Sequence, residues 1–188
     1  MELGPVKTFA GNGDYRALPE WIGWGNSAPT CQNSGLANTR FPIELQTYNV
    51  TAQRRVYDLL SSSLNEVPAF NRSLILLEGY SQQGVKAVPS EDSAYPFRGS
   101  NLLVAPVVRW VEEGNQSAVT AVKLGESLRD IFYESSGLKQ KRAYVNYAFG
   151  TESPQEVYGD EMWRQGKLIA LKKKYDPFGR FNFYAPIA

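Results

Sequence analysis

The sequence predicts an α+β fold in which an antiparallel β-sheet is covered on one face by helices. Two segments carry apolar residues at helical spacings of three and four, and several shorter segments are rich in the valine, leucine and aromatic residues of strands. With 188 residues, the chain is long enough to bury one sizeable core. We therefore expect a single domain over 1–188, with a loop-rich lead-in over 1–40 where glycine and proline recur.

The first element after the lead-in is a helix, expected over 51–64. Its apolar side chains recur at spacings of three and four: Val56, Leu59, Leu60 and Leu64. Either Asn49 or Thr51 is suited to cap its N-terminus, and Pro68 ends it.

Three strands are expected next, over 73–80, 84–88 and 101–111. The third strand contains Pro106, which cannot donate a backbone hydrogen bond to a neighbouring strand. We therefore expect an edge strand or a bulge at Pro106.

The remaining elements are a second helix over 116–133, a short aromatic strand over 143–149, and a last helix over 153–174. Gly137 stops the second helix. Ser153 and Glu156 have the spacing of a capping box, and Pro154 stands where a helix tolerates proline.

Composition excludes several classes of function. There is no histidine, which removes Ser-His-Asp catalysis and histidine metal sites, and the single cysteine, Cys31, forms no disulfide within the chain. The net charge of +1 provides no field to attract nucleic acid. No apolar run approaches the ~20 residues of a membrane span. The first twenty residues contain no continuous apolar stretch, so we expect no signal peptide.

Motifs over roughly 41–188 resemble the substrate and C-terminal region of FAD-linked oxidases of the berberine bridge enzyme family, in the family's order and spacing. The C-terminal motifs are Tyr144-Val145-Asn146-Tyr147, Tyr158-Gly159, Leu168, Leu171-Lys172, Lys174-Tyr175-Asp176-Pro177 and Phe181. The upstream motifs are Pro68-Ala69-Phe70, Glu78-Gly79-Tyr80, Gly84-Val85 and Ala94-Tyr95-Pro96-Phe97-Arg98.

The resemblance leaves out the half of the family that holds the flavin with a phosphate-binding loop and a histidine tether. It implies that Tyr144 and Asn146 are flavin neighbours. Phe97 stands where the family commonly has histidine. We therefore expect no cofactor on this chain alone, and FAD only if a partner chain supplies the missing half.

Glu78 and Tyr80 are the candidate catalytic residues. Two positions apart on a strand, they share one face, which suits proton donation and hydrogen bonding to a substrate. The alternative is a structural carboxylate, with Glu78 paired to Arg98 or Arg109.

Arg98, Tyr144, Asn146 and Tyr147 are the candidate substrate-binding residues. A guanidinium such as that of Arg98 binds an oxyanion through two hydrogen bonds, although the same group also suits an ion pair that holds its loop. The three residues of the aromatic segment are candidate pocket walls, and core packing is their alternative role.

These observations leave three hypotheses for the function. The first is a cofactor-free cyclase of fungal secondary metabolism, which holds a hydrophobic polyketide or terpenoid substrate for a Diels-Alder or hetero-Diels-Alder reaction. In this hypothesis, acid-assisted dehydration to a quinone methide can precede the cycloaddition. The second is the C-terminal half of a FAD-dependent oxidoreductase, and the third is a carrier of lipophilic ligands.

We also expect a homodimer, because the face that meets the flavin half in the family would otherwise remain exposed. Location stays open. Three glycosylation sequons begin at Asn49, Asn71 and Asn115, and this number suits a secretory ancestry.

Overall fold

The computed structural model describes residues 12–21, 35–111 and 115–187. The chain forms two compact units, 1–36 and 37–188. In the described part of the first unit, Asp14 caps the short helix η1 (Tyr15–Ala17), which is followed by α1 (Leu18–Trp21). Cys31 lies outside the described residues.

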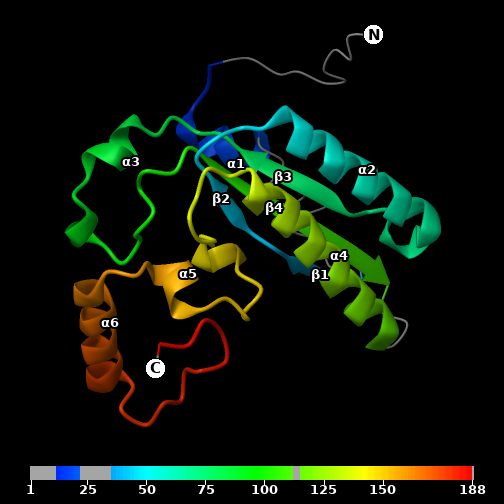
Figure 1. Ribbon diagram of the computed structural model, residues 1–188. Helices are drawn as coiled ribbons and strands as arrows, with labels where there is room; N and C mark the ends of the chain where they lie inside the picture. The colour runs from blue at the N-terminus through cyan, green and yellow to red at the C-terminus, as the bar shows by residue number, and fades with distance from the viewer. Residues whose placement is uncertain (1–11, 22–34, 112–114, 188) are drawn as a thin grey trace. The chain divides into compact units, whose positions relative to one another are not determined.

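The second unit is built around a four-stranded sheet of β1 (Leu36–Arg40), β2 (Ile43–Leu45), β3 (Leu74–Glu78) and β4 (Leu102–Val111). The long strand β4 neighbours the other three, and β2 and β3 pair with it antiparallel. Helices α2 (Val50–Glu66) and α4 (Asn115–Glu134) cover one face of this sheet (Figure 1). The predicted α+β fold is confirmed.

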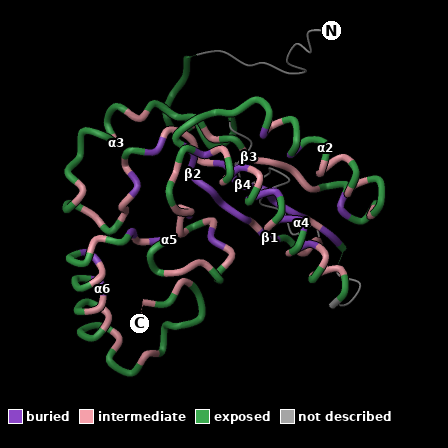
Figure 2. The backbone as a smooth tube through the Cα atoms, in the orientation of Figure 1, coloured by how far each residue is buried: buried purple, intermediate pink, exposed green. Residues whose placement is uncertain are grey.

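The core lies between the sheet and these two helices, where Figure 2 shows the buried chain concentrated on the strands and the inner helix faces. Its buried side chains come from β2, β4, α2, α4 and the short helix η2 (Pro68–Phe70): Ile43, Leu45, Val56, Phe70, Val104, Val108, Trp110, Ala121, Leu124, Leu128 and Phe132. Asn49 caps α2, accepting a hydrogen bond from the Ala52 N–H at 3.0 Å.

The prediction of an edge strand or a bulge at Pro106 is wrong, because β4 is the central strand. The proline is tolerated because β1 ends at Arg40 and β2 begins at Ile43, so the pairing partner is itself interrupted there. The Phe41 N–H in this gap donates to the Pro106 carbonyl at 3.0 Å. The proline therefore occupies a break in the ladder.

Two predicted strands are short helices in the structure. Residues 84–87 belong to α3 (Gln83–Ala87), and Val88 is its C-cap. Val85 and Val88 are three positions apart, which is a helical spacing. Residues 143–149 contain the 3-10 helix η4 (Val145–Tyr147). Tyr144 and Tyr147 are three positions apart, and their ring centroids lie 5.4 Å from each other.

The last predicted helix is two helices, α5 (Pro154–Tyr158) and α6 (Met162–Tyr175). The capping box of Ser153 and Glu156 is confirmed. The helix breaks at Gly159, which adopts φ 78° and ψ 170°, a conformation open essentially to glycine alone.

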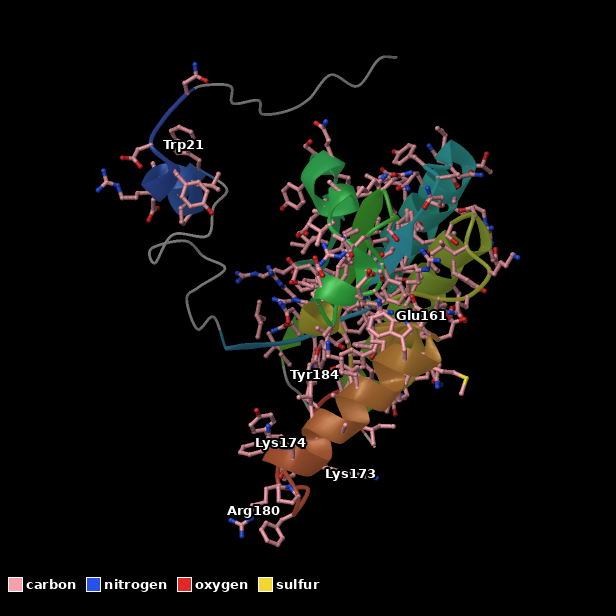
Figure 3. All side chains as sticks on the ribbon, turned by 90° about the vertical axis from the view of Figure 1, so that its left-hand side faces the viewer. Trp21, Glu161, Lys173, Lys174, Arg180 and Tyr184 are labelled. Atoms are coloured by element: carbon pink, nitrogen blue, oxygen red, sulfur yellow. The ribbon has the colours of Figure 1, made fainter. Side chains whose placement is uncertain are left out.

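Arg164 anchors α6 to the rest of the second unit. Its side chain is 2% exposed, forms an ion pair with Glu161, and donates to Ser90 Oγ of η3 (Ser90–Asp92) at 2.6 Å. Lys173 and Lys174 lie on the last turn of α6, away from this anchor, and Arg180 follows in the C-terminal segment (Figure 3). No helix among the described residues is both long and apolar enough to cross a membrane.

Candidate functional site

The Glu78 carboxylate and the Tyr147 phenol form the centre of the site. Glu78 ends β3, and the Tyr147 hydroxyl on η4 donates to its Oε1 atom at 2.9 Å. Burial first, and then the hydrogen bond and charge of Glu78, raise the pKa of Tyr147 to about 12. Tyr147 therefore remains a neutral hydrogen-bond donor at physiological pH.

A second carboxylate lies in the same row of the sheet. Glu44 of β2 and Glu78 of β3 both stand opposite Leu103 of β4, so the two carboxylates share the sheet face turned away from α2 and α4. Two strand spacings separate their backbones by about 10 Å. Glu44 is 2% exposed and accepts a hydrogen bond from the Tyr95 hydroxyl at 2.8 Å. Each carboxylate of the row is therefore held by a tyrosine.

Burial has the largest effect on the pKa of the Glu44 carboxyl. Burial raises the pKa of Glu44, and hydrogen bonds from Ser100 and Tyr95 and the charge of Arg142 oppose this shift. Burial and the charge of Glu44 likewise raise the pKa of Tyr95. Glu44 is a structural carboxylate beneath the aromatic cover, whereas Glu78 is the more accessible of the two.

Tyr80 lies beyond the end of β3 and is 67% exposed. Burial and the negative charge of Glu78 raise the pKa of Tyr80, and the Tyr80 phenol in turn contributes to the raised pKa of Tyr147. Glu78, Tyr80 and Tyr147 thus form one electrostatic group.

The other side of η4 borders an apolar pocket of about 480 Å³. Most of its walls are aromatic and aliphatic side chains of α5, η4 and the 94–98 loop, and Arg98 is the one cation among the described lining residues. The lining residues are Val85, Ala94, Tyr95, Pro96, Arg98, Tyr144, Val145, Asn146, Val157 and Tyr158. The Tyr144 ring contacts Tyr95 edge-on, with centroids 6.2 Å apart. Asn146 is exposed and donates from Nδ2 to the Tyr144 hydroxyl at 2.7 Å.

Arg98 lines this pocket without an ion pair. Its guanidinium donates to the Val85 carbonyl at 3.3 Å and to Ser93 Oγ at 2.6 Å. Among the ion pairs of the described residues, none joins Glu78 to Arg98 or Arg109. The alternative role of Glu78 as an ion-pair partner of those arginines is therefore wrong. Arg98 holds the loop through neutral acceptors.

Two side chains, Glu152 and Tyr184, fix η4 and the residues that follow it. Glu152 accepts hydrogen bonds from the Phe149 and Gly150 N–H groups at 2.9 and 2.8 Å, and forms a buried ion pair with Arg129 of α4 at 3.1 Å. The Tyr184 hydroxyl lies 2.6 Å from the carbonyl oxygens of both Val145 and Ala148. Packing therefore sets the positions of the η4 side chains before any ligand is present.

The six predicted site residues fall into two groups that η4 joins. Glu78, Tyr80 and Tyr147 lie over the sheet, and Arg98, Tyr144 and Asn146 line the apolar pocket. Sequence reasoning missed Glu44 and Tyr95. Alternation along β2 and a tyrosine beside Pro96 were the available signals, but strand register, which places Glu44 level with Glu78, is not readable from the sequence.

The geometry suits hydrogen bonding and proton transfer at a substrate hydroxyl. In the described part of the chain, Glu78 Oε2 accepts no hydrogen bond, while Oε1 is held by Tyr147. A carboxylate with one fixed and one open oxygen can accept a proton from a hydroxyl group on the ligand. No cluster of three metal-ligating side chains occurs among the described residues.

No protein-family model matches the chain. The chain is 44% identical over 186 residues to the FAD-linked oxidoreductase chyH of Penicillium rubens, and 42% identical over 188 residues to a FAD-linked oxidoreductase of Gibberella zeae. These matches cover 99% and 100% of this chain but 37% of each relative. The chain thus spans a little over a third of the length of these relatives.

The fold also matches a solved structure. Berberine bridge enzyme from Eschscholzia californica superposes with a TM-score of 0.65 and 16% sequence identity, covering 83% of this chain and 34% of that one. At this level of identity, the likeness shows a shared fold.

Proposed function

We propose that the chain forms the substrate-binding side of a FAD-linked oxidoreductase. This proposal is supported by its homology to the C-terminal part of berberine bridge enzyme-like FAD-linked oxidoreductases of fungal secondary metabolism. The observation that carries the proposal is the Glu78–Tyr147 pair between β3 and η4, with an apolar pocket of about 480 Å³ on the other side of η4. An apolar pocket with a few fixed polar groups is the usual form of a small-molecule site.

The residues of η4 fit the polar edge of a flavin ring. Asn146 has an exposed amide whose Nδ2 is held by Tyr144, so its oxygen is available to accept from a ring N–H. When bound, the flavin supplies an acceptor for two electrons and a proton from the substrate. This chain would contribute the substrate pocket and the groups that handle the substrate's proton.

In this proposal each residue has a separate role. Glu78 Oε2 accepts the proton of a substrate hydroxyl, and Tyr147 keeps the carboxylate oriented through Oε1. Tyr80 donates a hydrogen bond from the open end of the strand. Arg98, Tyr144 and Asn146 form the wall of the apolar pocket that holds the hydrophobic body of the substrate.

A chimera tests the proposal. In it, this chain replaces the corresponding part of the Penicillium rubens oxidoreductase, with which it shares 44% identity. We expect the chimera to bind flavin and to be reduced by the parent's substrates. Glu78→Gln should keep the flavin and slow its reduction about 10²-fold, whereas Leu77→Gln, on the opposite and exposed side of the same strand, should leave the rate unchanged. A colourless, folded chimera, or a Glu78→Gln rate equal to the parental rate, would refute the proposal.

A cofactor-free cyclase is the second candidate function. The Glu78–Tyr147 pair favours it, because an acid and a phenol at an aromatic pocket can assist loss of water and orient a diene without a redox group. The chain alone, free of flavin and oxygen, would then convert a polyene or a quinone-methide precursor. Turnover under these conditions supports the cyclase, and turnover that requires flavin excludes it.

A further inference from the structure

Arg40, at the end of β1, has no hydrogen-bond or ion-pair partner among the described residues. In the described part of the chain its guanidinium makes no ion pair and no hydrogen bond, and its Nε atom is buried without an acceptor. The guanidinium lies over the ring of Tyr147, with its Cζ atom 5.4 Å from the ring centroid. By contrast, the buried Arg129 forms an ion pair with Glu152, and the buried Arg164 forms one with Glu161.

Burying part of the Arg40 guanidinium without an acceptor costs free energy unless a ligand provides the acceptor. A partly buried charge without hydrogen-bond partners loses its hydration and receives nothing in exchange. A ligand with an acceptor group can compensate this loss. Several other arginines also have an unpaired Nε, but among the described residues the Arg40 guanidinium makes neither a hydrogen bond nor an ion pair.

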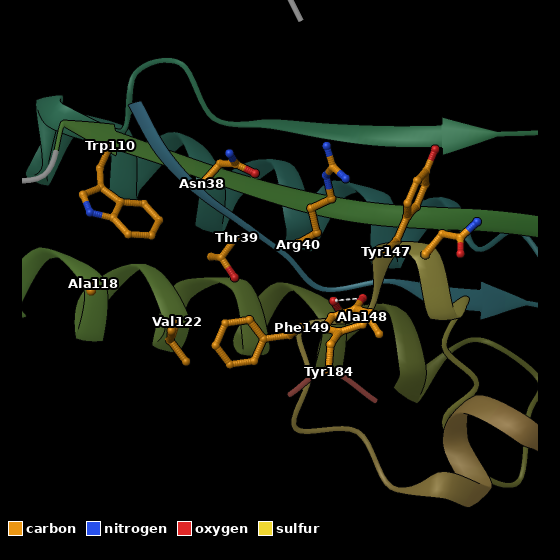
Figure 4. A pocket seen from close by; sticks show the side chains of 11 residues that line it. Asn38, Thr39, Arg40, Trp110, Ala118, Val122, Tyr147, Ala148, Phe149 and Tyr184 are labelled. Carbon is orange, nitrogen blue, oxygen red and sulfur yellow. Dashed lines mark hydrogen bonds between the residues drawn. The ribbon is translucent and has the colours of Figure 1, made fainter. Parts of the chain in front are cut away.

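Arg40 borders a second pocket, of about 420 Å³, which shares only Asn146 with the apolar pocket. Figure 4 shows Arg40 and Asn38 pointing to one side of β1, with Tyr147 beside Arg40 and Phe149 below the strand. Val122 of α4 extends the apolar floor. The pocket therefore has polar side chains on one side of β1 and apolar side chains on the other.

The described lining of the pocket is positively charged. Among its described residues there is no aspartate or glutamate, and Arg40 is the one charged side chain. The Arg40 charge opposes the effects of burial, Glu78 and Glu152, which raise the pKa values of Tyr147 and Tyr184. The Arg40 guanidinium is therefore the group of this pocket that can meet an anion.

We propose that this second pocket binds a small organic carboxylate with a flat, apolar body. The Arg40 guanidinium takes the carboxylate through two parallel hydrogen bonds, and the Asn38 amide, on the same side of β1, donates a further one. The Tyr147 ring beside Arg40 contacts the apolar body of the ligand. The site goes beyond the proposed function, because it adds a ligand held by Arg40 and Asn38, which the proposed function does not use, although Tyr147 belongs to both sites.

A carboxylate fits better than a phosphate group of a nucleotide. A phosphate carries nearly two negative charges and is usually met by several cations or by backbone N–H groups, whereas one guanidinium matches one carboxylate in charge and shape. The half-apolar lining likewise suits a ring more than a sugar phosphate.

Binding of 2-naphthoate to the purified protein, measured by isothermal titration calorimetry, tests the inference. We expect saturable binding that weakens at least tenfold in Arg40→Met. Arg142→Met is the matched control, because Arg142 is also a half-buried guanidinium that forms no ion pair with a described residue, but it lines neither pocket. It should leave the affinity for naphthoate unchanged. Thermal unfolding of each variant confirms that the fold is kept.

Asn38→Asp provides an independent test. Residues 38 and 40 share one side of β1, so the new carboxylate lies about 7 Å along the strand from Arg40 and supplies the missing acceptor. This variant should unfold at a higher temperature and lose naphthoate binding at least tenfold.

Three results would overturn the inference. The first is equal binding of the neutral amide 2-naphthamide, and the second is unchanged binding in Arg40→Met. The third is Arg40-dependent binding of ADP or inorganic phosphate in the absence of naphthoate binding, which would assign the site to a phosphate group.

Discussion

At the scale of single residues, the Tyr147 phenol connects the sheet to the segment that covers it. It donates to Glu78 and lies under the guanidinium of Arg40, so it responds to one negative and one positive neighbour. Its raised pKa makes the folded state sensitive to alkaline pH.

Stability should fall at high pH because of Tyr147. Its pKa is about 12 in the folded protein, against about 10 in an unfolded chain. The folded state holds this proton more tightly, so the stabilising contribution of Tyr147 is complete below about pH 10 and is lost as pH rises toward 12. Urea unfolding of Tyr147→Phe should show a shallower loss of stability between these values than the unmodified protein.

The control is Tyr57→Phe, because Tyr57 is 62% exposed on α2 and has no carboxylate partner among the described residues. Its loss of stability with pH should match that of the unmodified protein. Equal slopes for Tyr147→Phe and Tyr57→Phe would show that Tyr147 is not responsible.

At the scale of elements, the buried ion pair between Arg129 and Glu152 attaches α4 to the loop after η4. The two side chains are 9% and 2% exposed. Arg129→Met leaves the Glu152 carboxylate buried without its counter-charge, which should cost about 3–5 kcal/mol in the free energy of unfolding. Arg55→Met removes an exposed pair with Glu134 and should cost less than about 1 kcal/mol. Similar denaturant midpoints for the two variants would contradict this account.

The break between α5 and α6 depends on Gly159. Its φ of 78° and ψ of 170° are accessible to an alanine only with strain, and a Cβ atom there would meet Glu161 Oε2 at 2.4 Å. Gly159→Ala should therefore destabilise the protein by about 1–3 kcal/mol in chemical denaturation.

Gly166 provides the comparison, because it lies inside α6 and a Cβ atom there would meet nothing within 4 Å. Gly166→Ala should stabilise the protein by about 0.4–1 kcal/mol, since alanine loses less backbone entropy on folding. If both substitutions shift the midpoint in the same direction, backbone strain at Gly159 does not govern this break.

At the scale of the whole molecule, the C-terminal segment after α6 presents aromatic rings to solvent. Phe178, Phe181 and Phe183 are 82%, 79% and 98% exposed. Asp176 holds this segment in a defined turn by accepting from the Arg180 and Phe181 N–H groups at 2.8 and 3.0 Å. Clustered exposed rings of this kind mark surfaces that associate.

We therefore predict that the purified chain forms a homodimer through this segment. Light scattering at micromolar concentration should give twice the chain mass of 21.0 kDa. Replacing the three phenylalanines by serine should give the monomer mass, whereas Tyr57→Ser, an exposed aromatic residue of α2, should leave the dimer intact. A monomeric unmodified protein would disprove the prediction.

The helices that cover the sheet were predictable from the sequence, because their apolar residues repeat over many turns, as in α2 and α4. The short segments 84–88 and 143–149 were not, since five to seven residues contain too few repeats to separate a helical period from a strand period. Pro106 misled because the break between β1 and β2 that accommodates it is a property of the partner strand.

The same limit applies to the candidate site. The motif on η4 identified Tyr144, Asn146 and Tyr147, but no local pattern indicates that Tyr147 meets Glu78, 69 positions earlier. Arg40, which has no hydrogen-bond or ion-pair partner among the described residues, was equally hidden, because such a lack is visible only in the folded chain.

The contact of Tyr184 with the carbonyl oxygens of Val145 and Ala148 also sets an order for assembly during synthesis. Tyr184 follows Tyr147 by 37 positions. At ribosomal speeds of about 5–20 residues per second, it is added roughly 2–7 s later. The sheet and its two covering helices lie earlier in the chain, and such elements pair within milliseconds to about a second. The nascent protein therefore has time to form its core before Tyr184 can bind the carbonyl oxygens of Val145 and Ala148. The pockets that η4 lines are completed after the core.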